Sequence, residues 1–79
     1  MDDFSAGSYA ALCGGKIRDA RLASGLTQIQ LAEAISATQQ AVAKWESGRG
    51  VPRDAFRLKL CEVLGCSLDD LFGMPSEAA

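Results

Sequence analysis

The feature that most restricts the fold of this 79-residue chain is the segment from Gln28 to Ser47, which reads QIQLAEAISATQQAVAKWES. Its apolar residues recur at spacings of three or four, the period of an amphipathic helix. The break between its two halves is too short for an ordinary loop, so the segment predicts two short helices that cross closely and share one core. The apolar residues are Leu31, Ala32 and Ile35 in the first half and Val42 and Trp45 in the second.

Capping signals mark where both helices start. Thr27 can accept a hydrogen bond from the backbone N–H of Gln30, whose side chain can reach back to Thr27, and Leu26 and Leu31 occupy the flanking staple positions. Thr38 is a suitable N-cap for the second helix. We therefore expect helices that start at Thr27 and near Thr38.

Three further helices are expected around this pair, and the sequence shows no strand pattern. The first should lie within Ser8–Ala23 and start as late as Lys16, because the glycine pair 14–15 weakens its middle. Pro52 and Gly65 frame a helix from 53 to 64, and Ser67 caps one from 68 to 72. The expected fold class is all-α, a compact five-helix domain. Its expected divisions are a flexible N-terminus 1–8, a domain 9–73 and a loose tail 74–79.

Four pieces of the sequence, in this order and spacing, resemble the Cro/cI-type (lambda-repressor-like, XRE) helix-turn-helix family. They are GLTQIQLAEAI, TQQAVAKWESG, the proline at 52 and LKLCEVLGCSLDDLF, and the resemblance covers residues 16–72. It implies a lambda-repressor-like domain that binds double-stranded DNA. One departure is Ser36, where the family usually has glycine. The resemblance thus predicts a left-handed serine in the turn, at a cost of roughly 1 kcal/mol.

The second departure is the overall acidity, since the formal net charge is −2. All eight Lys and Arg residues lie between 16 and 59, and residues 16–62 net +3. A locally basic face suffices for a site-specific DNA binder, whereas the overall charge argues against strong non-specific adhesion to nucleic acid. We therefore expect a modest salt dependence.

Residues on the outward side of the second helix are the candidates for reading bases in the major groove, because Val42 and Trp45 point inward. Glutamine can bond to adenine, Lys44 to guanine, and alanine methyl groups can meet thymine. The resemblance implies that residues at the start of this helix carry most of the specificity. A merely solvated polar face is the alternative. The candidates are Gln39, Gln40, Ala41, Ala43 and Lys44.

Phosphate contacts are expected from other residues, because they position a domain without reading sequence. Free N–H groups at the start of the first helix of the pair, together with Gln28, form an anion site. For Lys16 and Arg18 a solvated surface role is equally expected. The candidates are Thr27, Gln28, Thr38, Arg49, Arg53, Lys16 and Arg18.

The resemblance also implies two structural features. One is a partly buried ion pair between Arg21 and Glu46. The other is a dimer contact through the C-terminal region, because the helix from 53 to 64 carries two rows of apolar residues. We assign the row Leu58, Cys61 and Leu64 to the core. The expected dimer interface is Phe56, Leu60, Val63 and Phe72.

Nothing in the sequence indicates an enzyme or a cofactor. The chain has three cysteines and no histidine, so a four-ligand zinc site and a histidine base are both missing. Cys13, Cys61 and Cys66 are expected to be small core residues, and the alternative for the last two is half a metal site or a redox pair. No transmembrane run or secretory signal is present, so we expect a cytoplasmic protein.

A chain of this length has room for one small domain and no effector domain, so no small-molecule effector is expected. The predicted function is a homodimeric transcriptional regulator, a Cro-like or controller-like repressor that binds a palindromic operator. The alternative is a protein-interaction module on the same fold, such as an antitoxin.

Overall fold

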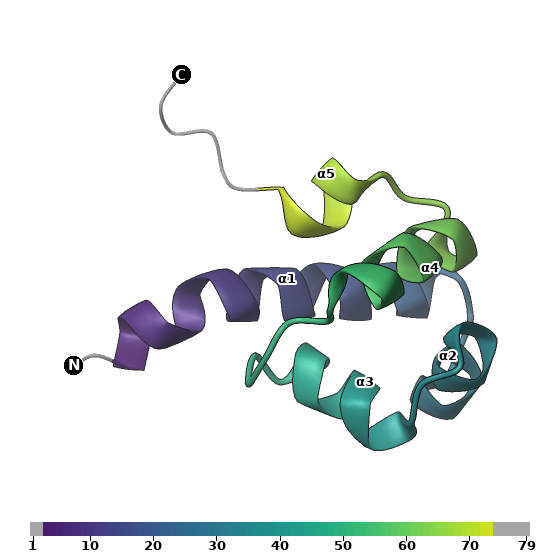
Figure 1. The fold of residues 1–79 in the computed structure, drawn as a ribbon, viewed down its shortest axis with the longest axis horizontal. Coiled ribbons are helices and arrows are strands. Elements are labelled where there is room, and N and C mark those ends of the chain that lie inside the picture. The colour runs from purple at the N-terminus through teal and green to yellow at the C-terminus, as the bar shows by residue number, and fades with distance from the viewer. Residues whose placement is uncertain (1–2, 74–79) are drawn as a thin grey trace.

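Five α-helices form the fold in the computed structural model, which describes the backbone of residues 3–73 and the side chains from Tyr9 to Gly73. No strand occurs in this part of the chain, so the all-α prediction is confirmed. The long α1 packs on α3 and α5, and α2 packs on α3 and α4 (Figure 1). The helices are α1 (Asp3–Ala23), α2 (Gln28–Ile35), α3 (Gln39–Glu46), α4 (Asp54–Leu64) and α5 (Leu68–Phe72).

The helix α1 begins at Asp3, well before the expected start between Ser8 and Lys16, so that start is corrected. Part of the segment 1–8 is therefore helical, whereas the tail 74–79 lies outside the described residues. The glycine pair does not interrupt α1, and the missing side chain of Gly14 lets α3 approach closely. A Cβ atom on Gly14 would overlap the carbonyl oxygen of Trp45, and one on Gly15 would meet nothing.

The core lies where α1, α2 and α3 meet the inner sides of α4 and α5. The five residues predicted to face it from α2 and α3 are all buried, which confirms the inward faces of the pair. The buried apolar residues are Cys13, Ile17, Leu31, Ala32, Ile35, Val42, Trp45, Leu60, Leu64, Leu71 and Phe72. Cys13 is fully enclosed, while Cys61 and Cys66 are only half-buried against this core.

The buried face of α4 differs from the expected one. Leu60 and Leu64 are buried one turn apart, whereas Leu58 is 59% exposed. Phe56 packs on Trp45 with 5.5 Å between ring centroids, which fixes the rotation of α4 about its axis. Leu60 and Phe72 cannot belong to a dimer interface, because both are enclosed in the core of their own chain. That part of the dimer assignment is wrong, and the assignment of Leu58 to the core is wrong as well.

The ends of the domain are joined by a hydrogen bond that sequence analysis did not anticipate. The hydroxyl of Tyr9 donates to the carbonyl oxygen of Phe72 at 2.7 Å, across 63 positions of sequence. The short α5 is capped as predicted, since Ser67 accepts from the N–H of Asp70 and the Asp70 carboxylate accepts from the N–H of Ser67. Within the described residues, no helix is long and apolar enough to span a membrane.

Candidate nucleic-acid interface

The pair α2 and α3 is held at its ends by side-chain caps. Thr27 Oγ1 accepts from the N–H of Gln30, and Gln30 Oε1 accepts from the N–H of Thr27, so the predicted capping box is confirmed. Thr38 Oγ1 accepts from the N–H of Ala41 at the start of α3, as expected. Each cap fixes the direction in which its helix leaves the preceding turn. The caps thereby set the exposed starts of both helices.

The turn between the two helices depends on Ser36. Its φ of 61° and ψ of 39° lie in the left-handed region, and it is the only described non-glycine residue with positive φ. The predicted left-handed serine is confirmed. A Cβ atom makes this conformation unfavourable, so the turn holds a small amount of backbone strain that glycine would relieve.

The outward face of α3 is presented to solvent because its opposite face is anchored in the core by Val42 and Trp45. Of the candidates for base contact, Gln39, Gln40 and Lys44 are exposed, whereas Ala41 and Ala43 are half-buried. The end of the Lys44 side chain lies along the loop after α3, since a Cβ atom on Gly50 would be 2.9 Å from Lys44 Cε. The two glutamines therefore occupy exposed positions at the start of the helix.

A partly buried ion pair ties α1 to the end of α3. Arg21 Nε donates to Glu46 Oε2 at 2.7 Å and Nη2 donates to Oε1 at 3.0 Å, while Nη1 donates to the carbonyl oxygen of Leu26 at 2.8 Å. Arg21 is only 8% exposed. The Glu46 carboxylate raises the pKa of the guanidinium above its ordinary value, and burial opposes this effect only in part. The guanidinium therefore stays charged, and its hydrogen bonds join α1, the end of α3 and the residue before the cap of α2.

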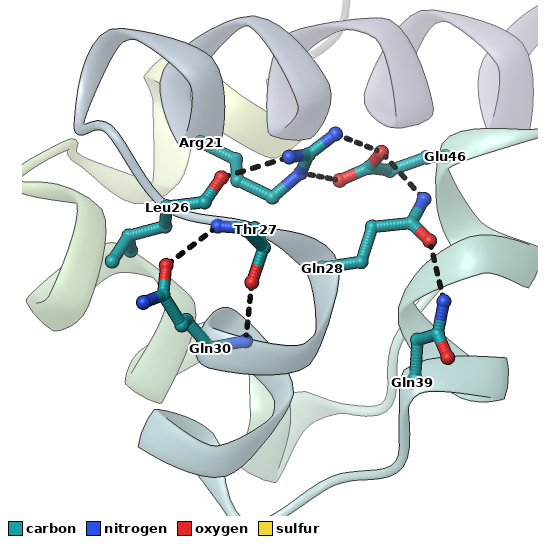
Figure 2. Close-up of polar contacts among 7 residues, drawn as sticks. All are labelled: Arg21, Leu26, Thr27, Gln28, Gln30, Gln39 and Glu46. Atoms are coloured by element: carbon teal, nitrogen blue, oxygen red, sulfur yellow. Dashed lines mark hydrogen bonds and ion pairs between the residues drawn. The ribbon is translucent and has the colours of Figure 1, made fainter.

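Polar contacts continue from this ion pair to the open face of α3 (Figure 2). Gln28 Nε2 donates to Glu46 Oε1 at 3.1 Å, and Gln39 Nε2 donates to Gln28 Oε1 at 3.3 Å. We call this series of hydrogen-bonded side chains, which runs from the Glu46 carboxylate through the amide of Gln28 to the amide of Gln39, the amide chain. Sequence analysis assigned Gln28 to phosphate and Gln39 to bases but missed that the two bond to each other, since their contact depends on how α2 meets α3.

The basic candidates are only partly gathered beside this face. Arg49 and Arg53 are exposed in and after the loop that follows α3, and Arg49 Nε donates to Ser47 Oγ at 3.2 Å. Lys16 lies elsewhere, near Asp70 on α5, where it helps to lower the pKa of that carboxyl group. Arg18 is exposed on α1. The structure thus brings Arg49 and Arg53 toward the end of α3 and directs Lys16 to the α5 side.

Arg57 is a basic residue that the structure assigns to packing. Its Nε donates to the carbonyl oxygen of Pro52 at 2.9 Å, and its guanidinium lies 5.0 Å from the centre of the Phe72 ring.

Among the described residues, no group of three or more His, Cys, Asp or Glu side chains is placed to hold a metal ion.

The sequence and the structure are similar to those of known proteins. A family model described as helix-turn-helix matches residues 17–71. The uncharacterized HTH-type transcriptional regulator YgzD of Bacillus subtilis is 32% identical over 62 residues, which cover 78% of this chain and 94% of that protein.

Two solved structures share the fold. One is the P22 c2 repressor protein in complex with synthetic operator 9T, which is 30% identical with a TM-score of 0.74 over 80% of this chain and 97% of that one. The other is the restriction-modification controller protein C.AhdI from Aeromonas hydrophila, which is 28% identical with a TM-score of 0.74 over 80% of this chain and 96% of that one.

Proposed function

Since the chain belongs to the lambda-repressor-like, XRE-type helix-turn-helix family and is a DNA-binding transcription regulator, we propose that it is a repressor that occupies a palindromic operator as a homodimer. In this proposal α3 enters the major groove with its N-terminal end first. Repression follows from occupancy of the operator. The protein would act in the cytoplasm, the compartment that holds the DNA.

The observation that carries the proposal is the polarity of the amide chain. A carboxylate has only acceptor atoms, so Gln28 must turn Nε2 toward Glu46 and Oε1 toward Gln39. Gln39 must then turn Nε2 toward Gln28. This leaves Gln39 with one free N–H and a free Oε1, both on the exposed side of α3.

That pair of free groups matches adenine. The free N–H can donate to N7 and Oε1 can accept from the N6 amino group, which is the bidentate contact that glutamine makes in the major groove. Gln40 and Lys44 supply the neighbouring base contacts, and Ala41 and Ala43, which are half-buried, supply at most methyl contacts to thymine.

Phosphate contacts support the position of α3 from both sides. The first N–H groups of α2 have no partner within the helix, and the Thr27 cap takes up only that of Gln30, so Gln28 and its neighbour offer donors to a phosphate. Thr38 adds a polar group at the start of α3. Arg49 and Arg53 contact the backbone beyond its end, and Arg18 is a more distant candidate.

The dimer face is revised toward the exposed side of α4 and α5. Leu58 is 59% exposed and Leu68 is 47% exposed. Together with Asp54 and Arg57 they line a hollow of about 350 Å³. An acidic and a basic side chain beside two leucines make a surface that can pair with its own copy across a two-fold axis. Phe56 and Val63, both half-buried, remain secondary candidates. Two half-sites would lie about 34 Å apart.

The first test is selection of bound sequences from a random duplex pool at about 150 mM salt. We expect a palindromic motif that contains adenine at one position of each half-site. Gln39→Ala should weaken binding to that motif by about 1–3 kcal/mol and leave binding to scrambled DNA unchanged. Ser24→Ala, an uncharged change at an exposed position outside the proposed interface, is the control. An equal loss on both DNAs would contradict the base contact.

The dimer is tested by sedimentation with and without the selected duplex. Leu58→Glu should shift the protein toward monomers while its helical signal stays unchanged, since Leu58 adds little to the core. Leu22→Glu is the control, because Leu22 is similarly exposed on α1. Monomers in every condition would overturn the dimer.

The exposed leucines of the hollow also favour a second candidate, a protein-interaction module of the antitoxin type. The same two experiments separate the candidates. No enriched motif from a folded sample would support the interaction module and contradict the operator proposal.

A further inference from the structure

The C-terminal end of α4 brings two cysteines together. Gly65 ends the helix in the left-handed region with φ of 68°, and the N–H of Cys66 then donates to the carbonyl oxygen of Cys61 at 3.0 Å. This backbone bond between the first and sixth residues is the Schellman arrangement, which is frequently accompanied by a contact between the side chains of those two residues.

The backbone bond also fixes the separation of the two Cα atoms. Standard bond lengths and an N···O distance of 3.0 Å place them about 5 to 6.5 Å apart. A disulfide requires roughly 4.4 to 6.8 Å between Cα atoms. The separation of the two Cα atoms therefore lies within the range that a disulfide spans.

Both thiols are free, and both residues are half-buried, so small molecules can reach them. Cys66 Sγ donates to the carbonyl oxygen of Leu64 at 3.5 Å, which turns this thiol back over the last turn of α4. Burial raises the pKa of the Cys61 thiol, and the neighbouring Cys66 thiolate and Asp70 carboxylate raise it further.

We propose that Cys61 and Cys66 form a redox-active dithiol that is reversibly oxidised within one chain by low-molecular-weight disulfides. One thiolate attacks a glutathione disulfide, forms a mixed disulfide and releases one glutathione thiolate. The second cysteine thiolate then displaces the other glutathione and closes the ring. Two protein thiols are oxidised, one glutathione disulfide is reduced to two thiols, and the two protons pass to glutathione.

The ring joins the last turn of α4 to the residue before the Ser67 cap of α5. Leu58 precedes this junction on α4, and Leu68 follows it on α5. A disulfide would therefore fix the angle between α4 and α5, the two helices that line the hollow. The chemistry itself depends neither on DNA nor on a dimer.

Cys13 provides an internal comparison. It is 2% exposed in the core, on the face of α1 that packs against other helices, and a small oxidant cannot reach it in the folded protein. Access depends on exposure, so Cys13 should stay reduced under conditions that oxidise the pair.

The test uses the full chain, which is first reduced and then equilibrated in glutathione buffers of defined thiol-to-disulfide ratio. The reaction is quenched with an alkylating agent, and the mass of the intact protein is measured by mass spectrometry. Cleavage after Lys16 and Lys59 places Cys13 in one peptide and both other cysteines in another. We expect a monomeric species that has lost two hydrogens from the C-terminal peptide, and an alkylated Cys13. Cys13→Ser should behave as the wild type.

Single variants sharpen this result. Cys61→Ser and Cys66→Ser should each stop at a mixed disulfide with glutathione on the remaining thiol. Mixed disulfides or cross-linked chains as the main product of the wild type would overturn the proposal. A second measurement needs no variant: phenylarsine oxide, which bridges two adjacent thiols, should bind the wild type one to one. Failure to bind would also overturn it.

Discussion

The two halves of this domain are held together by different kinds of interaction. The half that contains α2 and α3 is fixed by directional polar contacts, namely the caps at Thr27 and Thr38 and the Arg21–Glu46 ion pair. In the half that contains α4 and α5, Arg53 precedes α4 as its N-cap residue without making a side-chain cap hydrogen bond, and α4 is held by the apolar burial of Leu60 and Leu64.

This difference corresponds to what each half presents to a partner. Hydrogen bonds fix the orientation of a group, so the polar half can hold an amide in one of its two orientations. Apolar burial has no direction, so the other half can leave leucines exposed for a partner without disturbing its own packing. Specific reading of bases requires the first property, and pairing of two copies requires the second.

The largest effect should come from breaking the polar half at Glu46. Glu46→Ala leaves the buried Arg21 guanidinium without its partner, which should reduce the free energy of unfolding by about 3–5 kcal/mol. Most molecules of a domain of this size would then be unfolded near room temperature. Thermal and urea unfolding followed by circular dichroism measure the change. Glu33→Ala, exposed on α2, is the control, and a variant that melts normally would show that the ion pair is dispensable.

The close contact between α1 and α3 gives the next effect. Gly14→Ala should reduce the free energy of unfolding by about 1–3 kcal/mol, because the added methyl group meets the backbone of Trp45 and Glu46 and not a flexible side chain. Gly15→Ala is the matched control. It meets open space and should stabilise α1 by up to about 1 kcal/mol. Equal melting temperatures for the two variants would contradict this packing.

Arg53 lies where the two halves meet and tests whether the C-terminal half contributes to DNA binding. Arg53→Ala should weaken binding to every sequence by about 1.5 kcal/mol, and should flatten the slope of log affinity against log salt by about one unit. Lys59→Ala, exposed on α4, serves as the comparison. Fluorescence anisotropy at several salt concentrations measures both. An unchanged slope would remove Arg53 from the interface.

A substitution in the turn between α2 and α3 should increase the stability of the domain. Ser36→Gly relieves the left-handed backbone and should stabilise the domain by up to about 1 kcal/mol without changing DNA affinity. Ser47→Gly should lower stability, because Ser47 has φ of −83° and its hydroxyl donates to the carbonyl oxygen of Lys44. Differential scanning fluorimetry compares the two. A lower melting temperature for Ser36→Gly would mean that the serine side chain itself stabilises the turn.

The smallest effect concerns the cap of α5. Hydrogen bonds from Ser67 lower the pKa of the Asp70 carboxyl below 3.8, so its contribution to stability is present above that value and is lost as pH falls through the lower, folded value. Asp70→Asn keeps an acceptor but removes the charge. The melting-temperature difference between wild type and variant should therefore shrink as pH is lowered from 6 toward 2. A difference independent of pH would contradict the role of the charge.

Sequence reasoning succeeded where structure is set by neighbouring residues. The caps at Thr27, Thr38 and Ser67 and the left-handed Ser36 follow from local backbone geometry. It failed for the rotation of α4, because apolar residues occupy most of that helix and only the contact with Trp45 decides which row faces inward. From the sequence alone Gly14 is expected to weaken α1, because the contact that requires a glycine there is made by α3, about thirty positions away. The amide chain was missed for the same reason.

The hydrogen bond between Tyr9 and Phe72 has a consequence for synthesis of the chain. Its two partners are 63 positions apart, so this contact cannot form until Phe72 has left the ribosome. The caps of α2 and α3 and the Arg21–Glu46 ion pair use only residues from 21 to 46, so these polar contacts can form earlier. In a nascent chain the polar contacts that orient α2 and α3 can therefore form before Tyr9 and Phe72 are joined, and the Tyr9–Phe72 hydrogen bond is among the last contacts of the domain to form.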